Sequence, residues 1–99
     1  MQTTQTLSDT EGAIWSRLLE PVGKVLSLEA ARSIMRMEFG QDDKDRMHEL
    51  AAKAREGMLS PADEEDIRTY ERVGNLLALM KSKARQRLKR AAQANGSRR

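Results

Sequence analysis

A stripe of apolar positions dominates the C-terminal third of the chain. Along residues 67–91, apolar side chains return every three or four positions, which keeps them on one helix face for about seven turns. Ser60 and Pro61 precede the stripe as an N-cap and a first helical residue, and acids fill positions 63–66, where a helix dipole favours them. The stripe consists of Ile67, Tyr70, Val73, Leu77, Met80, Ala84, Leu88 and Ala91. This pattern predicts a helix over about 61–92, roughly 48 Å long.

Three shorter helices are predicted before the long one. Pro21 ends the first, Ser27 is a good N-cap for the second, and Gly57 lies where the third needs a C′ residue with positive φ. Their expected ranges are about 11–20, 28–38 and 42–56. The predicted fold class is all-α, a small helical domain centred on an αα-hairpin (about 42–56 and 61–92) with a long C-terminal helix.

The length of the chain, 99 residues, leaves room for a single domain. We assign residues 1–10 to a disordered leader because they are polar and lack periodicity, residues 11–92 to one helical domain, and residues 93–99 to a flexible basic tail. The absence of cysteine excludes disulfides and thiolate metal sites. Neither a secretion signal nor an apolar run of about 20 residues is present, so we expect a cytoplasmic protein without membrane contact.

Charge is distributed unevenly along the chain, whose formal net charge is +3. Residues 1–79 carry 10 Lys and Arg against 15 Asp and Glu, whereas residues 80–99 carry 8 Lys and Arg and no acid. On a helix, six of these cations fall along two flanks of the apolar stripe. One flank holds Lys81, Arg85 and Lys89, and the other holds Lys83, Arg87 and Arg90. Cations suit a helix C-terminus, but this many exceed that need and indicate contact with phosphates or with an acidic protein surface.

Groups that could catalyse a reaction or bind a metal are few. His48 is the only histidine, and no second histidine four residues away completes a zinc motif. The helix dipole explains the acids within 42–45 and 63–66, and the serines have no histidine partner nearby. We therefore expect no enzyme activity, no cofactor and no metal site.

The long predicted helix has more apolar face than the short helices can cover. Around Gly74, apolar residues occupy two sides of the same turns, which predicts contact with another chain, and we expect a homodimer through this helix. Trp15 is the one large anchor candidate; the frequent burial of aromatic residues favours its docking on the hairpin as core, and the alternative is an anchor for a partner. The predicted protein interface consists of Trp15, Val73, Leu76, Leu77, Leu79 and Met80.

Three runs within residues 31–87, more than half of the chain, carry a resemblance to a known family. They are Asp45–Gly57 (DRMHELAAKAREG), Leu59–Pro61 (LSP) and Tyr70–Arg85 (YERVGNLLALMKSKAR). The chain resembles a family of small helical bacterial proteins of uncharacterised role. The resemblance implies an antitoxin-like or adaptor function beside an HNH-type nuclease, and it transfers no catalytic residue.

Two functions are therefore expected. The first is a non-enzymatic helical protein–protein interaction module, an antitoxin-like partner of a nuclease, in which the acids at 63–66 occlude a basic cleft. The alternative is a nucleic-acid-binding accessory protein that lays its basic C-terminal helix, residues 81–90, on phosphates. Since no aromatic residue is interleaved there, binding would be to the backbone and would weaken steeply with salt.

Overall fold

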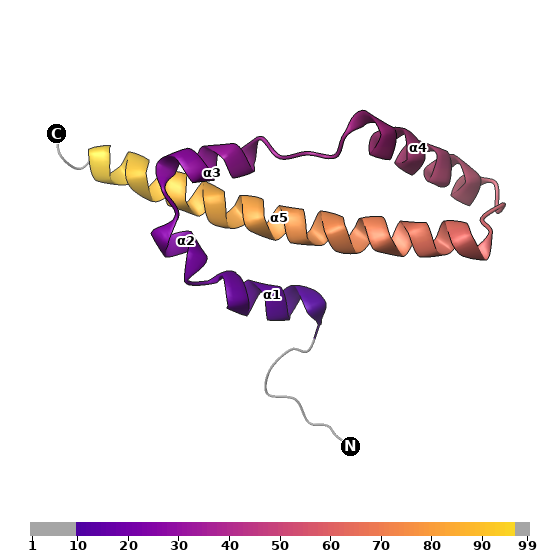
Figure 1. The fold of residues 1–99 in the computed structure, drawn as a ribbon, viewed down its shortest axis with the longest axis horizontal. Coiled ribbons are helices and arrows are strands. Elements are labelled where there is room, and N and C mark those ends of the chain that lie inside the picture. Colours follow the sequence, from indigo (N-terminus) through magenta and orange to yellow (C-terminus); the bar gives the residue numbers. More distant parts are fainter. Residues whose placement is uncertain (1–9, 97–99) are drawn as a thin grey trace, which may run out of the picture. The chain divides into compact units, whose positions relative to one another are not determined.

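The computed structural model describes residues 10–96, and its regular elements are all helical (Figure 1). They are α1 (Glu11–Leu19), α2 (Val22–Val25), α3 (Leu28–Met35), α4 (Gln41–Arg55) and α5 (Pro61–Gly96). The predicted all-α class with a long C-terminal helix is confirmed. The four-residue helix α2 was not predicted, and Pro21 stands at its N-cap. Residues 1–9 of the predicted leader and residues 97–99 of the predicted tail lie outside the described residues.

The chain forms two compact units, and α5 contributes to both. We name residues 38–75 the hairpin unit, because α4 lies antiparallel to the first half of α5 (Figure 1). We name residues 10–37 and 76–96 the basic unit, which contains α1, α2, α3 and the second half of α5. The hairpin unit has 11 Asp and Glu and 6 Lys and Arg, a net charge of −5. The described residues of the basic unit have 10 Lys and Arg and 3 Asp and Glu, a net charge of +7.

Backbone geometry explains how the hairpin turns. Gly57 has φ 69°, and its N–H donates to the carbonyl of Ala54 at 3.1 Å, while the N–H of Met58 donates to the carbonyl of Lys53 at 2.9 Å. These two bonds form a Schellman motif, which ends α4 and requires a residue that tolerates positive φ. The predicted role of Gly57 is therefore confirmed.

The start of α5 is held by a reciprocal cap. The Ser60 hydroxyl accepts a hydrogen bond from the Asp63 backbone N–H at 3.0 Å, and the Asp63 carboxylate accepts one from the Ser60 N–H at 3.0 Å. This is the arrangement of a capping box, with aspartate in the acidic position. The prediction that Ser60 caps this helix is confirmed, and both signals lie within four residues of sequence.

In the basic unit, α3 lies alongside the second half of α5 (Figure 1). Ser27 caps α3, since its hydroxyl accepts a hydrogen bond from the Ala30 N–H at 3.0 Å, as predicted. Ala31 on α3 and Ala84 on α5 are both completely buried. Since alanine side chains end at Cβ, the core of this unit is thin and buries little apolar area.

Candidate interaction surfaces

Apolar burial in the described part of the chain is unusually small. Only Ala31, Leu50 and Ala84 are fully buried apolar residues among residues 10–96. By contrast, seven large apolar side chains there are exposed: Ile14, Leu18, Val22, Val25, Met37, Met58 and Val73. Exposed apolar groups that cluster are typical of binding surfaces, whereas scattered ones are ordinary.

Four of these exposed side chains belong to the first two helices, α1 and α2. Ile14 and Leu18 are four residues apart, so they lie on one face of α1, and Leu18 is 61% exposed. In the next helix, α2, Val22 is exposed as well, and Val25 is 81% exposed. We call these four residues the α1–α2 apolar stripe. Trp15, the predicted anchor, is half-buried beside it.

The other predicted interface residues fall in both units. Val73 belongs to the hairpin unit and is 49% exposed. In the basic unit, Leu76, Leu77 and Leu79 are half-buried. Met80 lines a small hollow of about 40 Å³ formed by residues of all four helices of that unit. The lining residues of this hollow are Leu19, Val22, Leu26, Ile34, Met80 and Lys83.

One predicted flank of cations is engaged within the basic unit. Lys83 Nζ lies 2.8 Å from Glu20 Oε1, and this hydrogen bond lowers the pKa of the Glu20 carboxyl. Arg87 Nε donates to the carbonyl oxygen of Leu26 at 2.7 Å, and an Arg90 guanidinium nitrogen donates to the carbonyl oxygen of Gly23 at 2.6 Å. These cations satisfy carbonyl groups around α2, which a chain turn leaves without helical partners.

Gly23 is packed under the stem of Lys83. A Cβ added at Gly23 would lie 3.4 Å from Lys83 Cδ, and Gly23 itself is buried. The hydrocarbon part of the lysine therefore covers backbone while its ammonium group reaches Glu20. An alanine at position 23 would place its Cβ in ordinary van der Waals contact with the lysine stem.

The other predicted flank behaves differently. Within the described ranges, Lys81, Arg85 and Lys89 make no hydrogen bond or ion pair through their side chains. Arg85 and Lys89 are exposed, and Lys81 is half-buried. Since carbonyl contacts neutralise no charge, the engaged flank and the free flank both contribute to the net +7 of this unit.

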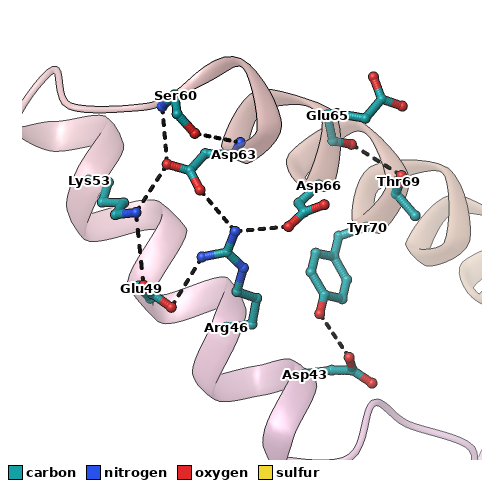
Figure 2. A network of polar contacts seen from close by, with 10 residues as sticks. All are labelled: Asp43, Arg46, Glu49, Lys53, Ser60, Asp63, Glu65, Asp66, Thr69 and Tyr70. Atoms are coloured by element: carbon teal, nitrogen blue, oxygen red, sulfur yellow. Dashed lines mark hydrogen bonds and ion pairs between the residues drawn. The ribbon is translucent and has the colours of Figure 1, made fainter.

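Asp63 is the centre of a polar network that joins α4 to α5 (Figure 2). Its side chain is 6% exposed and accepts hydrogen bonds from Arg46 at 2.9 Å and Lys53 at 3.1 Å. The hydrogen bond from the Ser60 N–H is the largest influence that holds the pKa of the Asp63 carboxyl far below its usual range. The hydrogen bonds from Arg46 and Lys53 lower this pKa further. Arg46 also reaches Asp66 at 2.8 Å, and these contacts raise the pKa of its guanidinium.

This network corrects one expectation. The acids at 63–66 were predicted to occlude a basic cleft of a partner. That prediction is wrong for Asp63, because its carboxylate is buried against the cations of α4. The helix dipole explains only part of the preference for an acid at position 63. The cations Arg46 and Lys53 of α4 explain the rest, and their pairing with Asp63 depends on the register of the hairpin, which the sequence alone does not give.

The opposite side of the hairpin is open and apolar. A groove of about 270 Å³ runs between α4 and α5 within the hairpin unit. Its lining residues are Met47, Leu50, Ala51, Ala54, Ile67, Tyr70 and Glu71. Sequence reasoning missed this groove, although the short side chains of Ala51 and Ala54 were a signal that this side of α4 is not filled.

Tyr70 is fixed at the groove by two contacts. Its hydroxyl donates to Asp43 Oδ1 at 2.8 Å, a bond that raises the pKa of the phenol. Its ring meets that of Phe39 edge to face, with centroids 5.9 Å apart and an interplanar angle of 75°. Such aromatic pairs add stability beyond the area they bury, so the groove wall is well ordered.

The described residues contain neither a candidate metal site nor a candidate membrane span. In residues 10–96, no group of three or more His, Asp or Glu side chains is placed to hold a metal ion, and His48 is exposed on α4. No helix of the described chain is both long enough and apolar enough to cross a membrane.

Comparison with known proteins yields no relative. No protein-family model, no curated protein and no solved structure matches the chain. No residue role can therefore be transferred from another protein. Function has to follow from the contacts, exposures and charges of the chain itself.

Proposed function

We propose that this protein is a non-enzymatic helical protein–protein interaction module of the cytoplasm, antitoxin-like in that it binds another protein. A nuclease is the partner class that the family resemblance implies. One observation carries the proposal: three apolar side chains of the described residues are fully buried, whereas seven large ones are exposed. A small domain gains stability when a partner covers such residues.

The α1–α2 apolar stripe is the surface that best fits a protein partner. Burying an exposed leucine or valine completely contributes roughly 1.5–3 kcal/mol. Leu18 and Val25 are the most exposed members, and half-buried Trp15 lies next to the stripe as an aromatic anchor. A patch of this composition on a folded helix docks without first having to order itself, which lowers the entropic cost of binding.

A homodimer is part of the proposal. The apolar residues Val73, Leu76, Leu77, Leu79 and Met80 of α5 were predicted to meet a second copy, and Val73 is half exposed. A twofold interface would use the same patch on both chains. Light scattering at micromolar concentration is expected to give the mass of two chains. The mass of one chain would refute the dimer but would not affect the proposal that the protein binds another protein.

Recovery of the tagged full chain from its native host tests the main proposal. The extract is divided into four arms, at low and moderate salt, each with and without nuclease treatment. We expect one companion protein in near-stoichiometric amount in all four arms, because apolar burial is insensitive to salt. If only nucleic acid is recovered, and salt releases it, the protein-binding proposal fails.

A nucleic-acid-binding accessory role is the second proposal, supported by the free cations of α5. Lys81, Arg85 and Lys89 lie on one flank without partners in the described chain, inside a unit of net charge +7. Their joint replacement by Gln is expected to lessen the slope of log affinity against log salt by about 0.9 for each phosphate that the variant no longer neutralises. A matched triple replacement in the hairpin unit, at Arg55, Arg68 and Arg72, should leave the slope unchanged.

A further inference from the structure

The open groove of the hairpin unit supports a more specific inference about a partner. Leu50 lies at its base, 2% exposed, while Ala51 and Ala54 on the same helix are exposed. The alanine side chains end at Cβ, so the space of about 270 Å³ between Met47 and Ile67 stays unfilled. Longer apolar residues at the two alanine positions would fill it from within the chain.

The groove is held open by contacts on its other side. Arg46 and Lys53 of α4 both bond to Asp63 of α5 across the hairpin (Figure 2). Tyr70 is fixed in the wall by Asp43, as the same figure shows. Polar contacts centred on buried Asp63 therefore tie the two helices together while the groove lining stays mainly apolar, which makes the groove largely preformed before any ligand arrives.

The shape and chemistry of the groove favour a helix as its occupant. Both walls are helices whose backbone groups are bonded internally, so an extended peptide would find no backbone partners there. An amphipathic helix satisfies its own backbone and offers apolar side chains at i, i+3 or i+4, and i+7. The groove spans Met47 to Ala54, about two turns, which matches that spacing.

Charge indicates the kind of helix. Glu71 lines the groove, and exposed Glu64 lies seven residues earlier on the same side of α5, while Arg68 between them is paired with Glu65 at 2.9 Å. The whole hairpin unit has a net charge of −5. We propose that the groove binds an amphipathic helix of another protein whose apolar stripe is flanked by Lys or Arg. This inference rests on the proposed protein-interaction function and names the chemistry of one partner segment.

A second copy of the chain is a poorer occupant. The cationic helix that the chain itself possesses is the second half of α5, and its apolar side is already used in the basic unit. Ala84 there is fully buried, and Met80 lines the hollow of that unit. The other helix with an exposed apolar face, α1, carries a single cation, Arg17, so it lacks two cationic flanks. We therefore assign the occupant of the groove to a different protein.

The test is a titration of the full chain, with labelled methionine and alanine methyl groups, followed by NMR. The probes are three synthetic helical peptides of about 18 residues, long enough to hold helix. One has a leucine stripe with Lys flanks, one has the same stripe with Glu flanks, and one has the Lys-flanked composition in scrambled order. The Lys-flanked peptide is expected to shift the methyl signals of Met47, Ala51 and Ala54 and to bind at least about tenfold more tightly than the scrambled one.

Two variants make the assignment specific. Glu71→Lys is expected to weaken the Lys-flanked peptide and strengthen the Glu-flanked one, each by about fivefold. Ala54→Leu fills the groove and should abolish the shift at Met47, whereas Ala62→Leu, on the exposed first turn of α5, should not. Glu71→Lys is a surface change, so the inference stays testable if Ala54→Leu disturbs the fold.

Three results would overturn the inference. The peptides could shift only signals of the basic unit, both flank types could bind equally, or the Met47 signal could move with the concentration of the chain alone. The last result would assign the groove to a second copy. None of these results affects recovery of a partner through the α1–α2 apolar stripe, so failure of the groove and failure of the proposed function are distinguishable.

Discussion

The two units of the molecule engage their cations differently, although Lys83 of the basic unit also pairs with an acid, Glu20. In the hairpin unit, cations meet acids: Arg46 and Lys53 share the carboxylate of Asp63, and that carboxylate also caps α5. In the basic unit, Arg87 and Arg90 meet backbone carbonyl oxygens. An ion pair cancels charge, whereas a bond to a carbonyl group leaves the cation uncompensated.

A cation that is hydrogen-bonded to a carbonyl group therefore keeps its charge. The basic unit retains a net charge of +7 although one flank of its cations is structurally committed. The hairpin unit remains at −5, but its most buried acid is already satisfied. The charges available to partners therefore include the unbonded flank at Lys81, Arg85 and Lys89 in one unit, and the groove edge at Glu71 in the other.

The largest expected effect comes from the apolar centre of the hairpin. Leu50→Ala removes the largest fully buried side chain of the described residues and should lower the free energy of unfolding by about 2–5 kcal/mol. Met58→Ala, at an exposed position of the same unit, should change it by less than about 0.5 kcal/mol. Urea denaturation followed by circular dichroism measures both, and equal effects would mean that the hairpin has no organised core.

The dependence of the free energy of unfolding on pH tests the ion pairing of Asp63 in the polar network. Because the pKa of Asp63 is lowered in the folded state, its ionised form stabilises the fold fully above its ordinary value of 3.8. That contribution is lost as the pH falls from there toward the lower native pKa, since the unfolded chain takes up a proton first. Asp63→Asn should therefore be less stable than the parent at neutral pH, and the gap should narrow below about pH 4. A gap independent of pH would contradict the ion pairing.

The two helix caps allow a comparison of matched substitutions. Ser60→Ala removes a hydroxyl that caps α5 inside a reciprocal pair with Asp63, and should cost about 1–2 kcal/mol. Ser27→Ala removes a single exposed capping bond to the Ala30 N–H and should cost about 0.5 kcal/mol. Thermal melts of both variants measure the two losses of stability. A larger loss for Ser27→Ala than for Ser60→Ala would contradict the expected order.

The smallest expected effect separates engaged from free cations. Arg87→Met leaves the carbonyl of Leu26 without its donor and should lower stability by about 1 kcal/mol. Arg85→Met makes the same chemical change on the free flank and should be neutral in stability within about 0.5 kcal/mol. For binding to a polyanion the ranking should reverse, with Arg85→Met the more harmful, because the free side chain can reach a phosphate.

The sequence allowed prediction wherever the determining signal was local. Ser60, the acids after it and the apolar period lie within one segment, so the start of α5 could be predicted, and Gly57 marked the end of α4 in the same way. The roles of the cations could not be predicted. Which carbonyl oxygens Arg87 and Arg90 meet depends on how residues 20–26 fold back, more than 60 positions away in sequence.

The groove escaped prediction for a similar reason. The sequence of α4 has apolar residues at helical spacing: Met47, Leu50, Ala51 and Ala54. Whether α5 covers this side of α4 depends on the register of the hairpin. That register is set by the contacts of Arg46 and Lys53 with Asp63, which tie one side of the helix pair and leave the other open. Likewise, the size of Trp15 marks it as a candidate anchor in the sequence, whereas no sequence feature shows that Leu18 and Val25 are the more exposed side chains.

The most direct test of the protein-binding account compares three tagged chains recovered from nuclease-treated host extract at moderate salt. They are the parent, a Leu18→Glu/Val25→Glu double variant of the α1–α2 apolar stripe, and an Ala62→Glu control on the exposed first turn of α5. We expect one companion protein to be recovered with the parent and the control and to be lost from the double variant. All three chains should have the same melting temperature. Equal recovery of the companion by all three chains, or no companion with the parent, would contradict the protein-binding account.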